Sequence, residues 1–336
     1  MSKKQKRDSH EQTSTTELRS GQRLQRWPSG RMWGTLGLLI VGGAFSLVLQ
    51  SREVESAAPS NLALVSSIHY QSQNHIHGLG YDSQNKQLFV ATHYGLFVWK
   101  DGQLFQLGDN RDDFMGFSLV PTNPKTIYTS GHPRGGGNMG VMRSEDGGLT
   151  FKNIFSGVKG ETVDFHSMVV SSVNPKILYG WFHGNFYRSK DGGKNWQIPA
   201  VRGLPSQGLC WGGPCFAPDS RVERIVYSGT PNGLLVSRDY GDNWAQLQND
   251  LGAVAAVGVH LNDPQTLWVF AQRVGLAVSR DAGKSWSSVG QGLKLSAKEF
   301  VFTFAFDGSN PDHLFAATGE QIVRSLDGGK SWQKIV

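Results

Sequence analysis

Short apolar runs alternate with turn residues along most of this chain. From about residue 75 onward, stretches rich in Val, Ile, Phe, Leu and Tyr are separated by clusters of Gly, Asn, Asp, Ser and Pro. Runs of this length and composition favour β-strands bounded by turns. Residues 166–198, for example, read as four strands: HSMVVSS, ILYGWFH, NFYRSKD and NWQI. The pattern therefore predicts an all-β fold.

An eight-residue phrase recurs between the third and fourth strand of these units. Its five copies are SEDGGLTF, SKDGGKNW, SRDYGDNW, SRDAGKSW and SLDGGKSW, and their aspartates are Asp146, Asp191, Asp239, Asp281 and Asp327. The aspartates lie 45, 48, 42 and 46 residues apart, and a degenerate copy, WKDGQLF, places Asp101 another 45 residues upstream. Six units of four strands predict a six-bladed β-propeller over 62–336, with 62–70 as an extra edge strand or clasp.

The repeated phrase resembles the Asp-box, or BNR repeat, of sialidases, sortilin-type receptors, xyloglucanases and photosystem II assembly-factor propellers. Its residue types explain a structural role. Glycine allows a tight turn, Asp and Ser bind loop amides, and the aromatic residue packs between sheets. We therefore expect the five aspartates to stabilise hairpins and not to catalyse a reaction.

The N-terminal region predicts a membrane anchor. Residues 32–51 carry no charge, and twenty residues at 1.5 Å rise match the hydrocarbon core of a bilayer, which is roughly 30 Å thick. Residues 1–31 hold eight Lys and Arg against three acids, which predicts a disordered cytoplasmic tail, and 52–61 form a linker. The propeller would then be extracellular or periplasmic on a single-pass protein of the cell membrane. The alternative is a cleaved signal peptide ending near Val54-Glu55-Ser56.

Most of the positive charge lies in that tail. The tail contributes +5 of the chain's net charge of +6, so the propeller is nearly neutral. A nearly neutral domain without a basic patch does not indicate a nucleic-acid partner.

Histidines gather in the first three units, on the propeller face opposite the repeated phrase. When the units are aligned on the aromatic residue of the second strand, three consecutive units have histidine four residues later, and further His and Met residues start the innermost strands. Imidazoles bind Zn, Cu, Fe and Ni, and thioethers additionally favour Cu(I). The sequence predicts a transition-metal site, with Cu or Zn as the ion, among His75, His77, His93, His132, His166, His183 and Met115.

Two carboxylates start equivalent strands in the same region. Asp113-Phe114-Met115 aligns with Asp164-Phe165-His166, so Asp113 and Asp164 enter one channel mouth from adjacent blades. Most glycosidases use a pair of carboxylates, one as acid and one as base or nucleophile. A glycoside hydrolase with Asp113 and Asp164 as catalytic residues is therefore a second hypothesis, although both could equally cap strand-end amides.

The chain resembles exported bacterial propellers that are called glycosylhydrolase-like. The resemblance rests on HIHGLG (75–80), THYGLF (92–97), MGF (115–117), SGHP (130–133) and DFH (164–166). It implies a shared site in blades one to three without establishing the reaction. Sialidase activity is not expected because the Phe/Tyr-Arg-Ile-Pro motif is absent. The arginines away from the boxes are scattered in sequence: Arg111, Arg134, Arg202, Arg221, Arg224 and Arg273.

Cys210 and Cys215 are the only cysteines. Outside the cytoplasm a disulfide is the default, whereas two free thiolates would bind metal, so these two alternatives exclude each other. For the whole chain we carry three hypotheses: a metal-binding module, a glycoside hydrolase, and a protein-interaction or assembly-factor scaffold. The possible partners are a glycan or an extracytoplasmic protein.

Overall fold

The computed structural model describes residues 62–64, 75–158, 160–210, 213–247, 250–293, 295–296 and 299–336. The predicted tail, membrane span and linker lie outside the described residues. Within the described part, no helix has the length and apolar character that crossing a membrane requires.

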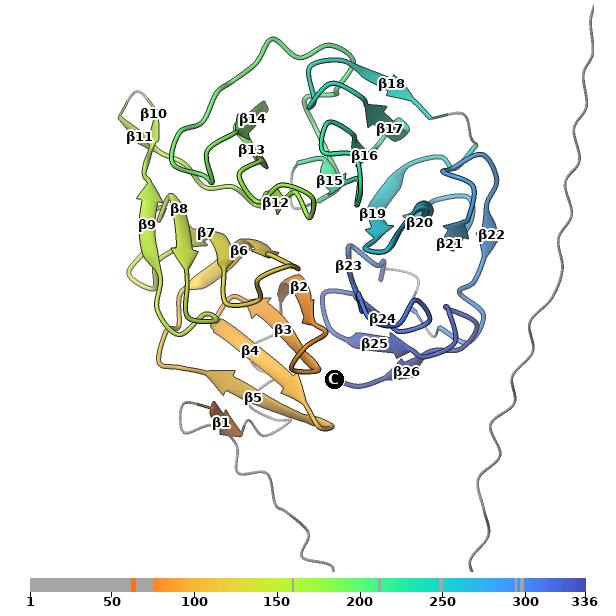
Figure 1. The fold of residues 1–336 in the computed structure, drawn as a ribbon, viewed down its shortest axis with the longest axis horizontal. Helices are drawn as coiled ribbons and strands as arrows, with labels where there is room; N and C mark the ends of the chain where they lie inside the picture. Colours follow the sequence, from red (N-terminus) through yellow and green to blue (C-terminus); the bar gives the residue numbers. More distant parts are fainter. Residues whose placement is uncertain are drawn as a thin grey trace, which may run out of the picture. The chain divides into compact units, whose positions relative to one another are not determined.

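The described strands form a six-bladed β-propeller, as the repeat spacing predicts (Figure 1). The first three blades are built from the following strands. Blade 1 contains β1 (Leu62–Leu64), β2 (Ile76–Asp82), β3 (Gln87–Thr92), β4 (Gly95–Lys100) and β5 (Gln103–Leu107); blade 2 contains β6 (Asp113–Leu119), β7 (Ile127–His132), β8 (Val141–Ser144) and β9 (Lys152–Phe155); blade 3 contains β12 (Ser167–Val170), β13 (Leu178–Phe182) and β14 (Asn185–Ser189).

The remaining blades each have four antiparallel strands. Blade 4 contains β15 (Cys215–Pro218), β16 (Val226–Thr230), β17 (Gly233–Ser237) and β18 (Trp244–Gln246); blade 5 contains β19 (Val254–His260), β20 (Asp263–Ala271), β21 (Gly275–Ser279) and β22 (Ser287–Ser288); blade 6 contains β23 (Thr303–Phe306), β24 (Leu314–Ala317), β25 (Ile322–Ser325) and β26 (Gln333–Lys334).

Blade 3 differs from the prediction at its outer edge. The expected fourth strand, NWQI, is reduced to one bridge between Arg188 and Gln197. A short hairpin that the sequence did not reveal, β10 (Gly157–Val158) with β11 (Glu161–Thr162), lies between blades 2 and 3. The predicted extra edge strand is present over Leu62–Leu64, where β1 pairs antiparallel with β5.

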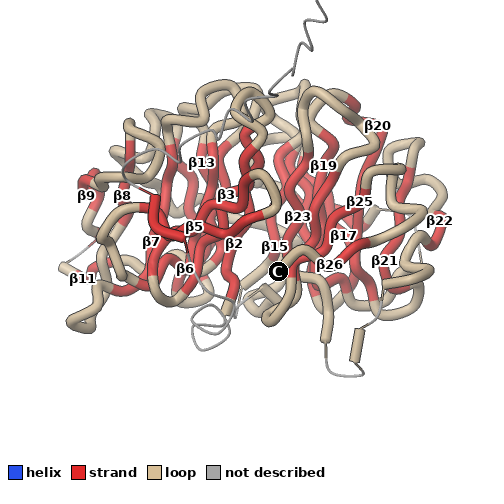
Figure 2. Tube along the Cα trace, turned by 90° about the horizontal axis from the view of Figure 1, so that it is seen from below, coloured by secondary structure: helices blue, strands red, loops and turns tan. Residues whose placement is uncertain are grey.

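The innermost strands β2, β6, β12, β15, β19 and β23 surround the central channel (Figure 1). The strands run between two ends of the propeller, where the loops are placed (Figure 2). The ring closes where β2 packs against β23, and the hydroxyl of Ser83 accepts a hydrogen bond from the amide of Gly308 at 2.9 Å. Apolar side chains fill the space between neighbouring blades; examples are Phe165, Trp268 and Phe315, each at most 1% exposed.

Each of the five repeated phrases forms the same hydrogen-bonded turn. In blade 5, Asp281 accepts hydrogen bonds from the hydroxyl of Ser279 at 2.7 Å and from the hydroxyl of Ser285 at 2.6 Å, while Ser279 accepts one from the amide of Gly283 at 2.7 Å. Because the turns join third to fourth strands, they lie at the opposite end from the loops that join second to third strands. The end of the propeller with the five repeated turns and the end with the histidines are therefore opposite faces.

These turns make the propeller sensitive to acid. Hydrogen bonds from the side chain and amide of Ser285 and from Ser279 lower the pKa of Asp281 from 3.8 to about 2, and Ser331 and Ser325 do the same for Asp327. A depressed folded-state pKa contributes stability above about pH 4 that is lost as the pH falls toward 2. We expect the thermal midpoint to fall across that window, and to fall less in an Asp281→Asn/Asp327→Asn variant, measured by circular dichroism. Asp101→Asn, in a hairpin turn outside the five boxes, should keep the wild-type pH dependence; an equal loss in all three proteins would contradict the assignment.

Candidate metal-binding site

Irregular pairing near the start of two innermost strands turns side chains toward the channel. The register of β2 with β3 skips His77, and the register of β6 with β7 skips Met115. A β-bulge places one extra residue in the strand and changes the direction of its side chain. His77 and Met115 line the channel, as does His166 at the equivalent position just before β12.

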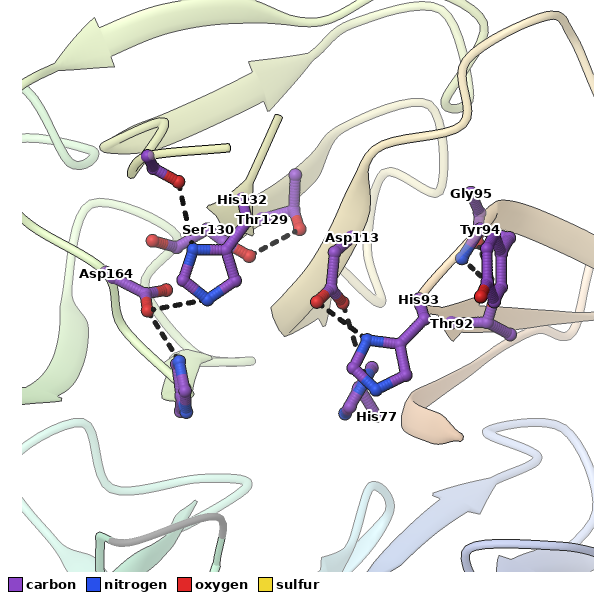
Figure 3. A network of polar contacts seen from close by, with 12 residues as sticks. His77, Thr92, His93, Tyr94, Gly95, Asp113, Thr129, Ser130, His132 and Asp164 are labelled. Carbon is purple, nitrogen blue, oxygen red and sulfur yellow. Dashed lines mark hydrogen bonds and ion pairs between the residues drawn. The ribbon is translucent and has the colours of Figure 1, made fainter. Parts of the chain in front are cut away.

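One cluster joins blades 1 and 2. His77 starts the inner strand of blade 1, His93 follows the second strand of the same blade, and Asp113 starts the inner strand of blade 2. His93 Nδ1 lies 2.7 Å from Asp113 Oδ2, and His77 Nε2 lies 3.4 Å from Asp113 Oδ1 (Figure 3). One ligand atom from each of the three residues lies within 4.8 Å of the other two.

A second cluster of the same composition joins blades 2 and 3. Asp164 Oδ2 lies 2.5 Å from His166 Nε2 and 3.3 Å from His132 Nε2. His132 Nδ1 lies 3.0 Å from the carbonyl of Gly137 (Figure 3). We assign a proton to Nδ1, which makes Nε2, the nitrogen beside Asp164, the candidate metal ligand. Asp164 is 7% exposed, and its buried Oδ1 accepts no hydrogen bond from the described residues.

The propeller repeat relates the two clusters. In each, a histidine at the end of the second strand of one blade meets an aspartate at the entrance to the inner strand of the next blade. His93 meets Asp113 in this way, and His132 meets Asp164. Asp113 and His132 are also direct cross-strand partners in β6 and β7, so the two clusters are neighbours.

The buried histidine of the first cluster is neutral. Burial, and then the nearby imidazoles of His93, His75, His166 and His132, lower the pKa of His77 to about 2. The 3.4 Å approach to Asp113 is therefore a contact of a neutral imidazole and not an ion pair, although both groups are ionisable. A neutral imidazole binds a metal ion without first losing a proton.

Three residues of the predicted metal set lie outside both clusters. His183 occupies the same blade position as His93 and His132, but its Nδ1 lies 3.2 Å from Glu161 Oε1, and both side chains are more than half exposed. The segment entering blade 4, residues 203–218, has no acidic residue to meet it. His75 is exposed, with its ring 5.0 Å from that of His93, and Met115 lines the channel.

Asp113 and Asp164 were predicted as a catalytic pair separate from the histidines. The structure instead places each carboxylate against two imidazoles. The blade alignment was the sequence signal for this arrangement, because it put Asp and His at fixed positions of consecutive units. The alignment did not show that the end of the second strand of one blade meets the start of the first strand of the next blade.

A disulfide joins Cys210 and Cys215, with their Cα atoms 5.3 Å apart, and both residues line the channel. A pair joined in this way offers no thiolate to a metal ion.

Two hollows adjoin the clusters. One is the channel itself, with a volume of about 220 Å³, and the other is a cleft of about 600 Å³ beside His93 and Asp113, which we call the outer cleft. Tyr94, Arg111 and Arg134 line the cleft. The sequence offered Tyr94 as an aromatic surface for a sugar, but it did not assign either arginine to the site.

No protein-family model matches this chain, and no curated protein matches its sequence. Among solved structures, the GH74 enzyme of Niastella koreensis superposes with a TM-score of 0.57 at 18% identity, and the GH74 xyloglucanase of Xanthomonas campestris with 0.54 at 17%. Each match covers 82% of this chain but only 46% and 56% of those chains. A candidate gluconolactonase matches with a TM-score of 0.54 at 10% identity over 82% of this chain and 93% of its own. At these identities the likeness shows the propeller fold alone.

Proposed function

We propose that this propeller binds divalent transition-metal ions at two sites on one face of its channel. The observation that carries the proposal is the pair of clusters, His77–His93–Asp113 and His132–Asp164–His166, each with its three ligand atoms mutually within 4.8 Å. Bonds of 2.0–2.1 Å in a tetrahedral site hold ligand atoms about 3.3 Å apart, so small side-chain adjustments suffice. Zn²⁺ and Cu²⁺ both suit two imidazoles and one carboxylate.

The number of protein ligands supports a reactive site. Structural zinc sites use four protein ligands, whereas catalytic sites use three and keep one position open. A bound ion would act as a Lewis acid or would lower the pKa of a bound water. The two imidazoles and the carboxylate of each cluster would hold it, and the channel and the outer cleft would give a ligand access to it.

The proposal includes a location outside the cytoplasm. A single span over 32–51 would anchor the propeller to the membrane, and the disulfide between Cys210 and Cys215 supports an oxidising compartment. A protease-accessibility experiment tests this orientation: we expect added protease to digest the propeller while the cytoplasm is still closed. Digestion only after the cytoplasm is opened would contradict the proposed orientation.

Elemental analysis of the full chain, purified without a polyhistidine tag, tests the metal sites. We expect up to two ions of zinc or copper per chain after reconstitution, and a clear loss in a His93→Ala/His132→Ala variant. His183→Ala is a matched control, because His183 has the same blade position but pairs with Glu161 outside the clusters. Wild-type protein without metal, or equal loss in the control, would reject the proposal.

Glycoside hydrolysis is a second candidate, supported by the two carboxylates at one mouth beside a cleft of about 600 Å³. It predicts turnover of an oligosaccharide that persists in metal-free protein and disappears in Asp113→Asn or Asp164→Asn. Absence of both metal and turnover, with a protein recovered by crosslinking in membranes, would instead favour the scaffold.

A further inference from the structure

The outer cleft has walls from two neighbouring blades. His93 and Tyr94 come from the turn after β3, Arg111 and Asp113 from the segment that enters β6, and Arg134 from the glycine-rich loop after β7. Two residues of the cleft, His93 and Asp113, belong to the first metal cluster. A ligand in the cleft would therefore contact an ion held there.

Arg111 is held in place at one wall. Its Nη1 donates hydrogen bonds to the carbonyl of Gly108 at 2.9 Å and to the carbonyl of Asn110 at 2.8 Å. Those bonds use one nitrogen of a five-donor group. Within the described part of the chain, no carboxylate forms an ion pair with Arg111.

Arg134 lines the same cleft from the loop after β7. The backbone amide of Arg134 donates a hydrogen bond to Asp112 Oδ1 at 2.9 Å, which ties the glycine-rich loop to the segment that carries Arg111. The Arg134 side chain itself is exposed, and no carboxylate among the described residues pairs with it. Two guanidinium groups on loops tied together thus border one cleft without a fixed anionic partner.

We propose that this cleft is an oxyanion subsite, in which Arg111 and Arg134 bind the phosphoryl or carboxylate group of a small ligand. Guanidinium forks match both groups with paired, charge-assisted hydrogen bonds. Tyr94, which is 47% exposed, offers a flat apolar surface to the rest of the ligand. The coupling to a metal ion rests on the proposed function; the binding of an anion by the two arginines does not.

The charge of Asp113 sets the metal dependence. In the metal-free protein this carboxylate lies in the same cleft and opposes an anion, although His93 lies 2.7 Å from it. A divalent ion in the His77–His93–Asp113 cluster reverses the local charge. Anion affinity should then rise when the metal is bound, and metal affinity should rise by the same factor when the anion is bound.

Calorimetric titration of the full chain with inorganic phosphate, and separately with malonate, tests the subsite at low ionic strength. We expect Arg134→Ala to bind roughly ten- to hundredfold more weakly, the usual effect of losing a hydrogen bond to a charged group. Arg111→Lys, which keeps the charge but not the fork, should weaken binding less. Arg238→Ala, an exposed arginine in the box turn at the opposite face, should bind as the wild type does.

The outcomes separate this inference from the metal proposal. Arginine-dependent binding of phosphate alone identifies a phosphoryl ligand, and arginine-dependent binding of malonate alone identifies a carboxylate ligand. Such binding in a protein that holds no metal supports the subsite while rejecting the proposed function. The subsite is overturned if neither anion binds, or if Arg134→Ala binds like the wild type, with elemental analysis confirming unchanged metal content in the variant.

Discussion

Replacing Asp164 with Asn should remove one metal ion per chain and leave the other. Asp164 is the only carboxylate in its cluster and contacts both imidazoles through Oδ2. An amide has no negative charge to offer, and loss of a direct ligand should exceed the roughly 10- to 100-fold cost of losing an outer partner. Elemental analysis and competition with a chromogenic chelator measure the number of ions and their affinity.

The equivalent change in the neighbouring cluster provides the matched test. Asp113→Asn should remove the ion held by His77 and His93, and the double variant should hold none. His183→Ala should retain both ions. Loss of both ions from either single variant would show that the clusters form one joint site, and retention of both would exclude the carboxylates as ligands.

Gly116→Ala should destabilise the propeller and disturb the second cluster. A Cβ at Gly116 in β6 would lie 2.0 Å from the carbonyl oxygen of Phe165, which is a backbone atom. Phe165 is buried and lies between Asp164 and His166, so the segment that carries both proposed ligands, just before β12, must move. Overpacking of this kind costs roughly 1–3 kcal/mol. We expect a lower urea midpoint and weaker metal binding at this cluster.

Gly135→Ala is the control for this prediction. Nothing lies within 4 Å of a Cβ placed at Gly135, and its φ is not positive, so the urea midpoint should stay near that of the wild type. If Gly116→Ala unfolds at the wild-type urea concentration and keeps both ions, the close contact between β6 and the start of blade 3 does not hold the site.

The repeat was sufficient to predict the architecture. Asp146, Asp191 and the three later box aspartates lie at one blade interval, and the turn they form depends on residues within about four positions of each other. Local interactions of this type are readable from sequence, and six intervals indicate six blades. The fourth strand of blade 3 was misread because its residues have strand composition but make only one bridge.

Local sequence also predicted which side chains gather at the candidate site. His93 and His132 lie at the ends of equivalent strands, Asp113 and Asp164 lie at the entrances to equivalent strands, and the alignment placed all four at one mouth. It treated the histidines and the carboxylates as rival sites, one for metal and one for sugar. Nothing in a single unit shows which residue of the next unit it meets.

Only the tertiary structure decided the partnerships. Packing of adjacent blades brings His93 to Asp113 and His132 to Asp164, across about 20 and 32 residues of chain. His183 has the same place in its blade, yet the segment that enters the next blade, residues 203–218, has no carboxylate, and His183 instead lies 3.2 Å from Glu161. Sequence alone thus determined the blades and the residue types, because both depend on local periodicity. The two His/Asp clusters depend on contacts between blades, which only folding of the ring establishes.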